Sequence, residues 1–308
     1  MKTKYLAFVA AAFMLASCSN DEDFVPKDDL KDTPITVTAG VAELKTRAGY
    51  DAEKLPETFY LSIDQTGTKY DYTNVLMTKA TDNNTYTPAS TLLWAGGTDR
   101  ATVTAATFSL DGTQTLSVQA DQSTADGVKA SDHLMMAATS VAPSAEGISV
   151  NFSHFMSKVM LTITLGDEFN AAENPISNVT FKGTVASNSY TAGTGWTEIA
   201  TDAETTKITP LAGIYTPINT EEGITNSSAE YEVILLPQTV AANGFEVQFN
   251  IGDRVFKWTS QNAVTLASGT KYTLALTAGK DMVSSATFST SAWNAGEGDD
   301  NNLSGETE

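Results

Sequence analysis

Short runs in which apolar and polar residues strictly alternate recur along the chain. In FEVQFNI, residues 245–251, every second side chain is apolar, and VMLTITL, residues 159–165, repeats this pattern. A period of two places one side of a strand in a core and the other in water, which is typical of antiparallel sheets. Turn-forming segments separate the runs, for example LDGT at 110–113 and AANG at 241–244. Many short strands joined by such turns predict an all-β chain made of β-sandwiches.

One stretch near the middle of the chain interrupts this pattern. GDEFNAAENPIS, residues 166–177, combines acidic residues, Asn, Gly and Pro without an apolar period. Such a composition is typical of a boundary between domains. The sequence therefore predicts an N-terminal β-sandwich over residues 48–170, a C-terminal β-sandwich over 171–296 and a polar tail over 297–308.

The first residues have the layout of a secretory signal. Met1 to Ser17 carries a basic start, an apolar stretch and small residues directly before Cys18, the only cysteine of the chain. The order Leu, Ala, Ser, Cys is similar to the cleavage and lipidation motif of bacterial lipoproteins. We therefore expect a signal peptide over residues 1–17 and a lipid on Cys18, since several acyl chains on one cysteine give a durable membrane anchor. The acidic run at 19–23 is either a solvated linker or, by its resemblance to the acidic sorting tag of surface lipoproteins, a signal for export to the cell surface.

Composition excludes several functions. The chain has 37 acidic and 18 basic residues, a formal charge of −19, which repels the phosphate backbone of nucleic acids. Hydrophobic residues make up 41% of the chain and charged residues only 18%, as expected for a packed core. With one cysteine in the chain, disulfides within it and cysteine-rich metal sites are excluded.

The stretch ITVTAGVAELKTRAGY, residues 35–50, follows the acidic linker. Its alternation predicts a half-buried strand that leads directly to Arg47 and Ala48. An exposed Arg before a small residue suits a trypsin-like protease, although most Arg residues in loops are simply solvated. The apolar residues of the strand that share one parity are Ile35, Val37, Ala39 and Val41.

The lipoprotein cysteine, the acidic start, the early strand and the TRA segment together resemble the fimbrillin family, which builds the type V pili of Bacteroidales. Later segments carry the same resemblance across the mature chain. They are DHLMMAATS (132–140), ISVNFSHFMSKVMLTITL (148–165), VILLPQT (233–239), GTKYTLALTA (269–278) and SAWNAG (291–296).

This resemblance implies two transthyretin-like β-sandwich domains in tandem and assembly by strand exchange with other pilin subunits. It implies that an Arg-specific protease cuts between Arg47 and Ala48. The cut removes the lipid together with residues 18–47, the acidic linker and the removable strand Ile35 to Leu44. A strand of another subunit then fills the groove. The protein would pass from the outer membrane at the cell surface to the pilus.

The position in the pilus stays open between tip, stalk and anchor. A stalk subunit must also donate a strand, and MVSSATFSTSAW, residues 282–293, offers few large apolar anchors. This favours a tip or accessory subunit that adheres to a glycan or a surface protein. The alternative is a permanently anchored surface lipoprotein that binds glycan through exposed tryptophans. A lone tryptophan of a β-sandwich more often fills the core or its rim, which is the expectation for Trp94, Trp196, Trp258 and Trp293. Trp94 and Trp196 are the better candidates for exposure, because nearby glycines place them near turns.

The sequence contains no recognisable catalytic motif. His133 and His154 are expected as packed or surface histidines, because neither has further partners at a spacing typical of a metal site or a catalytic relay. The sequence contains no nucleophile elbow, HExxH motif or phosphate-binding glycine loop. We therefore expect a non-enzymatic protein without a metal or a cofactor.

Overall fold

The computed structural model of the chain describes residues 30–41, 49–51, 53–65, 68–81, 84–97, 99–280 and 283–293, with 284–287 described by their backbone. Within these ranges the only helical elements are α1 (Ala125–Ser131) and a 3-10 turn, η1 (Asp167–Phe169). No helix of the described part has the length and apolar character needed to cross a membrane. The prediction of an all-β chain is confirmed.

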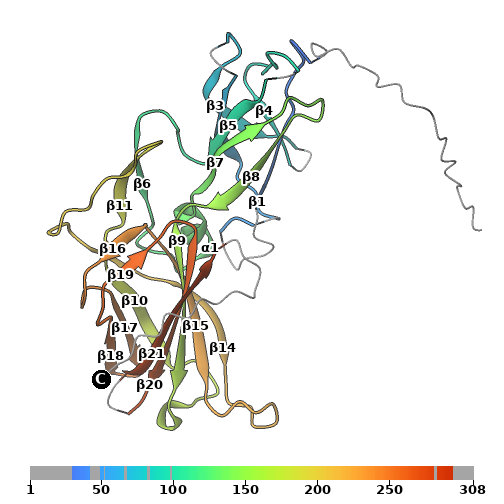
Figure 1. The fold of residues 1–308 in the computed structure, drawn as a ribbon. Helices are drawn as coiled ribbons and strands as arrows, with labels where there is room; N and C mark the ends of the chain where they lie inside the picture. The colour runs from blue at the N-terminus through green and yellow to red at the C-terminus, as the bar shows by residue number, and fades with distance from the viewer. Residues whose placement is uncertain are drawn as a thin grey trace, which may run out of the picture.

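Seven strands of the N-terminal half close into a barrel in the order β1-β4-β3-β2-β5-β7-β8 (Figure 1). All neighbours run antiparallel except β1 and β8, which run parallel. The predicted tandem sandwiches are not confirmed here, because β1 bonds to a strand on either side and joins the sheet into a ring. The bounds are β1 (Val37–Val41), β2 (Thr58–Asp64), β3 (Tyr72–Lys79), β4 (Thr85–Pro88), β5 (Ala101–Ala106), β7 (Leu134–Val141) and β8 (Ile148–His154).

The C-terminal half contains two larger sheets that share one hydrophobic core. The five-stranded sheet has the order β14-β15-β9-β20-β21, and the parallel pair β9 and β20 lies in it. Its bounds are β9 (Ser157–Leu165), β14 (Leu211–Thr216), β15 (Ser228–Leu235), β20 (Thr270–Ala278) and β21 (Val283–Ala292). The four-stranded sheet has the order β13-β10-β17-β18, with β10 (Ile176–Thr184), β13 (Thr206–Ile208), β17 (Glu246–Ile251) and β18 (Arg254–Thr259).

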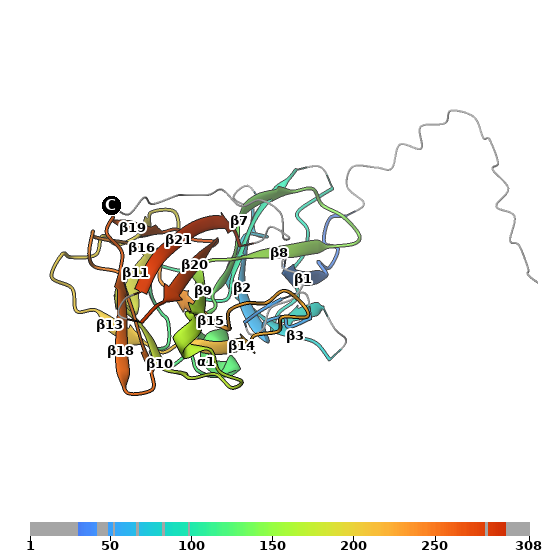
Figure 2. The same cartoon turned by 90° about the horizontal axis from the view of Figure 1, so that it is seen from below.

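Residues 107–131, which connect β5 to β7, leave the barrel and pack on the second core through Leu116, Val118 and Val128. This excursion contains α1, which lies near the place where the barrel meets the C-terminal sheets in Figures 1 and 2. It also contains β6, a member of one of two small sheets beside the larger ones. These sheets are β12-β11-β6, with β6 (Thr113–Ser117), β11 (Ser187–Thr191) and β12 (Gly195–Trp196), and β16-β19, with β16 (Gln238–Val240) and β19 (Val264–Leu266).

The division between the two cores falls earlier than the predicted boundary at residues 170 and 171. β9 pairs with β15 and β20, and its side chains lie in the second core. The acidic stretch 166–177 therefore connects two strands of the same unit. Its composition marks a loop, but the sheet that a strand joins depends on partners distant in the sequence. That each core folds as a separate domain stays a prediction.

The alternation in the sequence matches the buried faces of the strands. In β9, Val159, Leu161, Ile163 and Leu165 are buried, and Met160, Thr162 and Thr164 between them are half-buried. β17 repeats this arrangement with Val247, Phe249 and Ile251. Each fully buried side chain of this size contributes about 1.5–3 kcal/mol. β9 and β17 therefore contribute much of the buried apolar surface of the second core.

We expect Leu161→Ala to lower the free energy of unfolding by about 2–5 kcal/mol, because it leaves a cavity in the second core. Leu161 is 1% exposed, whereas its neighbour Thr162 is half-buried on the opposite face of β9. Thr162→Ala should therefore cost less than about 1 kcal/mol. Urea unfolding of both variants measures the difference, and equal losses would contradict the assigned core.

Candidate functional site

β1 is held on both edges by backbone hydrogen bonds. It runs parallel to β8 over five residue pairs, from Val37 opposite Ile148 to Val41 opposite Phe152. On its other edge it pairs antiparallel with β4. Further bonds extend the contact before and along the strand: the Ile35 N–H donates to the Leu92 carbonyl at 2.8 Å, and the Ile148 N–H donates to the Thr36 carbonyl at 2.8 Å. Although β1 is short and lies near the start of the described chain, it is therefore paired on both edges like an internal strand of a sheet.

The side chains of this segment alternate between the barrel core and the surface. Ile35, Val37, Ala39 and Val41 are 6%, 1%, 5% and 7% exposed, and Thr36, Thr38 and Gly40 between them are half-buried or exposed. The four residues named from the sequence therefore all face the core of the barrel. Their release and replacement stay a prediction.

An aromatic group lies in the barrel core that β1 helps to close. The Phe59 ring lies 4.7 Å from the Tyr86 ring and 5.2 Å from the Phe152 ring, centroid to centroid. Tyr86 stands opposite Val37 in β4, and its hydroxyl donates to the Pro56 carbonyl. Burial raises the pKa of Tyr86 to about 12. Phe59, Tyr86 and Phe152 are at most 2% exposed, so the barrel interior beside β1 is well shielded from water.

Trp94 is part of this shielded interior, as expected for a lone tryptophan of a β-sandwich, and it is not the exposed platform that the glycan-binding alternative requires. It is 0% exposed, and its Nε1 donates to the Ser144 carbonyl at 3.1 Å. Its backbone also bonds to the residues before β1, with the Asp32 N–H donating to the Trp94 carbonyl and the Trp94 N–H donating to the Thr33 carbonyl, both at 3.0 Å. The glycines that follow Trp94 mark a turn, but they do not determine where its side chain points.

Gly147 lies against the backbone just before β1. A Cβ atom at this position would stand 2.0 Å from the Thr36 carbonyl oxygen, and the residue has a φ of +85°. Both the contact and the left-handed backbone require glycine. The start of β8 can therefore approach the β1 segment closely enough for the bond between Ile148 and Thr36.

The segment that follows the predicted cut is held by a buried carboxylate at the end of α1. The Tyr50 N–H donates to Asp132 Oδ2 at 2.8 Å, and a Cβ on Gly49 would stand 2.7 Å from the same oxygen. The other oxygen, Oδ1, lies 2.8 Å from His154 Nδ1. The His154 ring in turn stacks on the Trp293 indole, with centroids 4.0 Å apart and planes 2° apart. These contacts connect the segment after β1 to the end of β21.

The two histidines have different surroundings. His154 is buried and paired with Asp132, so it is a packed histidine rather than a surface one. His133 is half-buried, and its Nε2 lies 3.1 Å from the Ser117 carbonyl oxygen. Burial lowers the pKa of His133. The sequence did not indicate the Asp132 and His154 pair, because 22 residues separate the two and no local spacing relates them.

Three of the predicted positions, Cys18, Arg47 and Ala48, lie outside the described residues. The described chain resumes at Gly49, two residues after Arg47, and Val41 is the last described residue before it. Among the described residues, no group of three or more His, Cys, Asp and Glu side chains is arranged to hold a metal ion.

The fold and this site define an all-β protein in which an N-terminal strand completes a barrel. A family model described as Fimbrillin-like matches residues 46–293, and the chain therefore belongs to the fimbrillin-like family. The resemblance found in the sequence is confirmed. No curated protein matches the chain.

Two solved structures share the fold. A candidate cell adhesion protein from Bacteroides uniformis is 18% identical with a TM-score of 0.57, and the match covers 84% of this chain and 98% of that one. A candidate cell adhesion protein from Bacteroides ovatus is 15% identical with a TM-score of 0.61, covering 85% of this chain and 98% of that one. The similarity extends over both cores.

We expect Gly147→Ala to loosen β1 from β8, because the added methyl group would collide with the Thr36 carbonyl. Gly193→Ala is the matched control, since Gly193 has a φ of +86° but no atom within 4 Å of its Cβ position. Both variants share a backbone strain of about 1–3 kcal/mol. Hydrogen exchange of the β1 amides should accelerate in Gly147→Ala alone, and the same rates in both variants would contradict the role of this contact.

A second prediction concerns Asp132, which is 3% exposed. Asp132→Ala removes the acceptor of the Tyr50 N–H and the partner of His154, and we expect the free energy of unfolding to fall by about 3–5 kcal/mol. The exposed Asp202 lies in a turn, so Asp202→Ala should change stability by less than about 0.5 kcal/mol. Urea unfolding measures both, and a small loss in Asp132→Ala would show that the junction does not depend on this carboxylate.

Proposed function

We propose that this chain is a fimbrial subunit that assembles by strand exchange, and that the segment containing β1 is the strand that is removed and replaced. One observation carries the proposal. β1 bonds to β4 on one edge and to β8 on the other, so its departure would leave a groove with two unpaired strand edges. Such edges are templates for pairing with an incoming strand. Membership of the fimbrillin-like family supports the fimbrial role.

The energetics of the groove are consistent with this mechanism. Fully burying each of Ile35, Val37 and Val41 contributes about 1.5–3 kcal/mol, so removing them exposes surface that costs roughly 5–9 kcal/mol. A whole domain is stable by only about 5–15 kcal/mol. The emptied barrel should therefore bind a replacement strand tightly. Backbone bonds to β4 and β8 would supply affinity, and apolar side chains at alternate positions would fix the register.

The contacts on either side of the proposed cut support its position. Val41 is buried in the barrel, and the Tyr50 backbone is bonded to Asp132 at the junction of the two cores. A cut between Arg47 and Ala48 by an Arg-specific protease would separate two anchored segments. β1 could then leave without displacing the chain from Gly49 onward. The precursor would be held at the outer membrane on the cell surface by a lipid on Cys18 and would join the pilus after the cut.

The last strand favours a tip or accessory subunit. β21 pairs antiparallel with β20 from Ala292 opposite Thr270 to Val283 opposite Ala278. Trp293, directly after β21, is buried against His154. This segment is therefore in use within its own subunit. Residues 282–293 also offer few large apolar side chains with which to anchor in another subunit. We therefore propose that this subunit accepts a strand without donating β21, a structural role that agrees with the fimbrillin-like family.

The first test determines the N-terminus of the protein in material sheared from the native cell surface, by mass spectrometry. We expect high-molecular-weight polymer that starts at Ala48, and we expect Arg47→Ala to abolish polymer formation. Lys45→Ala, which changes a base two residues away, should leave assembly intact. An acylated Cys18 found only in the membrane fraction would overturn the proposal and favour a permanently anchored surface lipoprotein.

The same prediction can be checked in solution with a labelled peptide of residues 35–44, ITVTAGVAEL. Protein cut at Arg47 and freed of its strand should bind this peptide, and uncut protein should not, because β1 occupies the groove. A peptide that carries Val37→Asp is the control, since it places a charge where Val37 is 1% exposed. Equal binding of the two peptides would show that the groove does not select the strand.

A further inference from the structure

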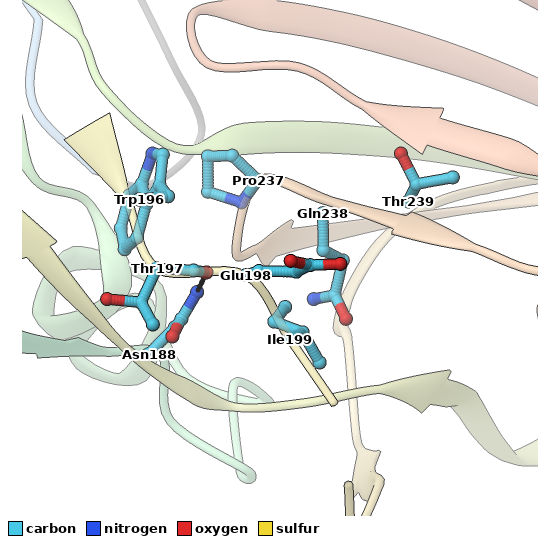
Figure 3. A pocket seen from close by; sticks show the side chains of 8 residues that line it. All are labelled: Asn188, Trp196, Thr197, Glu198, Ile199, Pro237, Gln238 and Thr239. Carbon is cyan, nitrogen blue, oxygen red and sulfur yellow. Dashed lines mark hydrogen bonds between the residues drawn. The ribbon is translucent and has the colours of Figure 1, made fainter. Parts of the chain in front are cut away.

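A hollow of about 320 Å³ opens beside the two small sheets of the second unit. Trp196, Ile199 and Pro237 form its apolar part, and Thr197, Glu198 and Thr239 contribute polar groups. Figure 3 shows Trp196 at one end of the hollow and Thr239 at the other, with Glu198 and Gln238 between them. The volume lies at the lower end of the range for small-molecule sites, about 300–1,000 Å³.

Neighbouring aromatic rings hold the indole of Trp196 in place. It stacks on Phe155 with centroids 5.5 Å apart and planes 20° apart, and the Tyr190 ring lies 5.3 Å away. Its Nε1 points to the Ser268 hydroxyl at 3.4 Å. The side chain remains half-buried rather than enclosed. Since neighbouring rings already hold the indole in place, it offers an apolar surface whose ordering costs little on binding.

Two amide side chains hold the walls of the hollow. Asn188 Nδ2 donates to the Thr197 carbonyl at 2.8 Å (Figure 3), and Asn188 Oδ1 accepts from the Ser189 N–H at 2.8 Å. Gln238 Oε1 accepts from the Val185 N–H at 3.0 Å, and its Nε2 donates to the Val185 carbonyl at 3.2 Å. Both amide side chains are therefore hydrogen-bonded within the protein. The groups left to contact a bound molecule are the Glu198 carboxylate and the hydroxyls of Thr197 and Thr239.

The chemistry of the hollow narrows the class of ligand. The Thr197 carbonyl is taken by Asn188, and the Thr197 N–H donates to the Ser189 carbonyl at 2.8 Å, so a peptide strand finds no main-chain partner at this residue. Glu198 is the ionisable side chain of the hollow, and its carboxylate repels phosphates and carboxylates. A flat aromatic ring beside hydroxyls and a carboxylate suits a molecule with one C–H face and several hydroxyl groups.

We infer that this hollow binds an uncharged pyranose ring of a surface glycan. The C–H face of the sugar lies on Trp196 and Pro237, and neighbouring sugar hydroxyls donate to the Glu198 carboxylate. The Thr197 hydroxyl and the Thr239 hydroxyl, whose oxygen also lies 3.3 Å from the Thr265 hydroxyl oxygen, complete the polar contacts. This site lies in the second unit, away from the β1 groove, so it does not depend on strand exchange and would serve adhesion before or after processing.

The test uses the uncut, full-length protein and four probes: N-acetylglucosamine and the methyl glycosides of glucose, galactose and mannose. Saturation-transfer NMR should show transfer to the ring protons of at least one probe. Trp196→Ala should weaken binding of that probe about tenfold or more. Trp258→Ala is the matched control, because Trp258 is also half-buried but lies on β18, and it should leave binding unchanged.

Glu198→Gln provides a second variant that keeps the fold, since Glu198 is exposed. It should weaken binding about fivefold, because a neutral amide accepts hydroxyl hydrogen bonds less strongly than a carboxylate. Urea unfolding confirms that each variant is folded. No transfer to any of the four probes, or equal binding by Trp196→Ala and the unchanged protein, would overturn the inference. Either result would leave the assembly proposal untouched, because Arg47 and the β1 groove are unaltered in every sample.

Discussion

The barrel of the N-terminal half depends on one short strand. Without the backbone bonds of β1, the strands β4 and β8 would each carry an unpaired edge, and the ring would be an open sheet. Unpaired edges attract other strands, and a closed barrel is the arrangement that removes them. β1 thus satisfies backbone groups on both sides while its side chains cover Phe59, Tyr86 and their neighbours in the core.

A second constraint joins the barrel to the rest of the molecule. The carboxylate of Asp132 accepts a hydrogen bond from the Tyr50 N–H and is hydrogen-bonded to His154, which stacks on Trp293. Near Trp293, Lys158 lies 5.3 Å from the indole centroid and forms a buried ion pair with Glu232 at 3.1 Å. Buried polar groups of this kind cost free energy unless they are paired. The junction therefore depends on a chain of partners drawn from five separate parts of the sequence.

We propose different roles for the barrel and for the second unit. The barrel contains the strand whose exchange we propose, and the second unit has a tryptophan held by Phe155 at an open hollow. Membership of the fimbrillin-like family agrees with both proposals. The segment after the proposed cut stays bonded at the junction, so an exchange in the barrel need not disturb the hollow.

Local patterns in the sequence determined the all-β class and the buried faces of β1, β9 and β17, because the period of two follows directly from strand geometry. The order of segments also determined the family. The sequence did not reveal the closure of the barrel, since β1 meets β8 only after an intervening stretch of about a hundred residues. Nor did it reveal the pairing of Asp132 with His154 or the excursion of residues 107–131 into the second core. Periodicity states which side of a strand is buried, and only the tertiary structure decides which distant strand or side chain covers it.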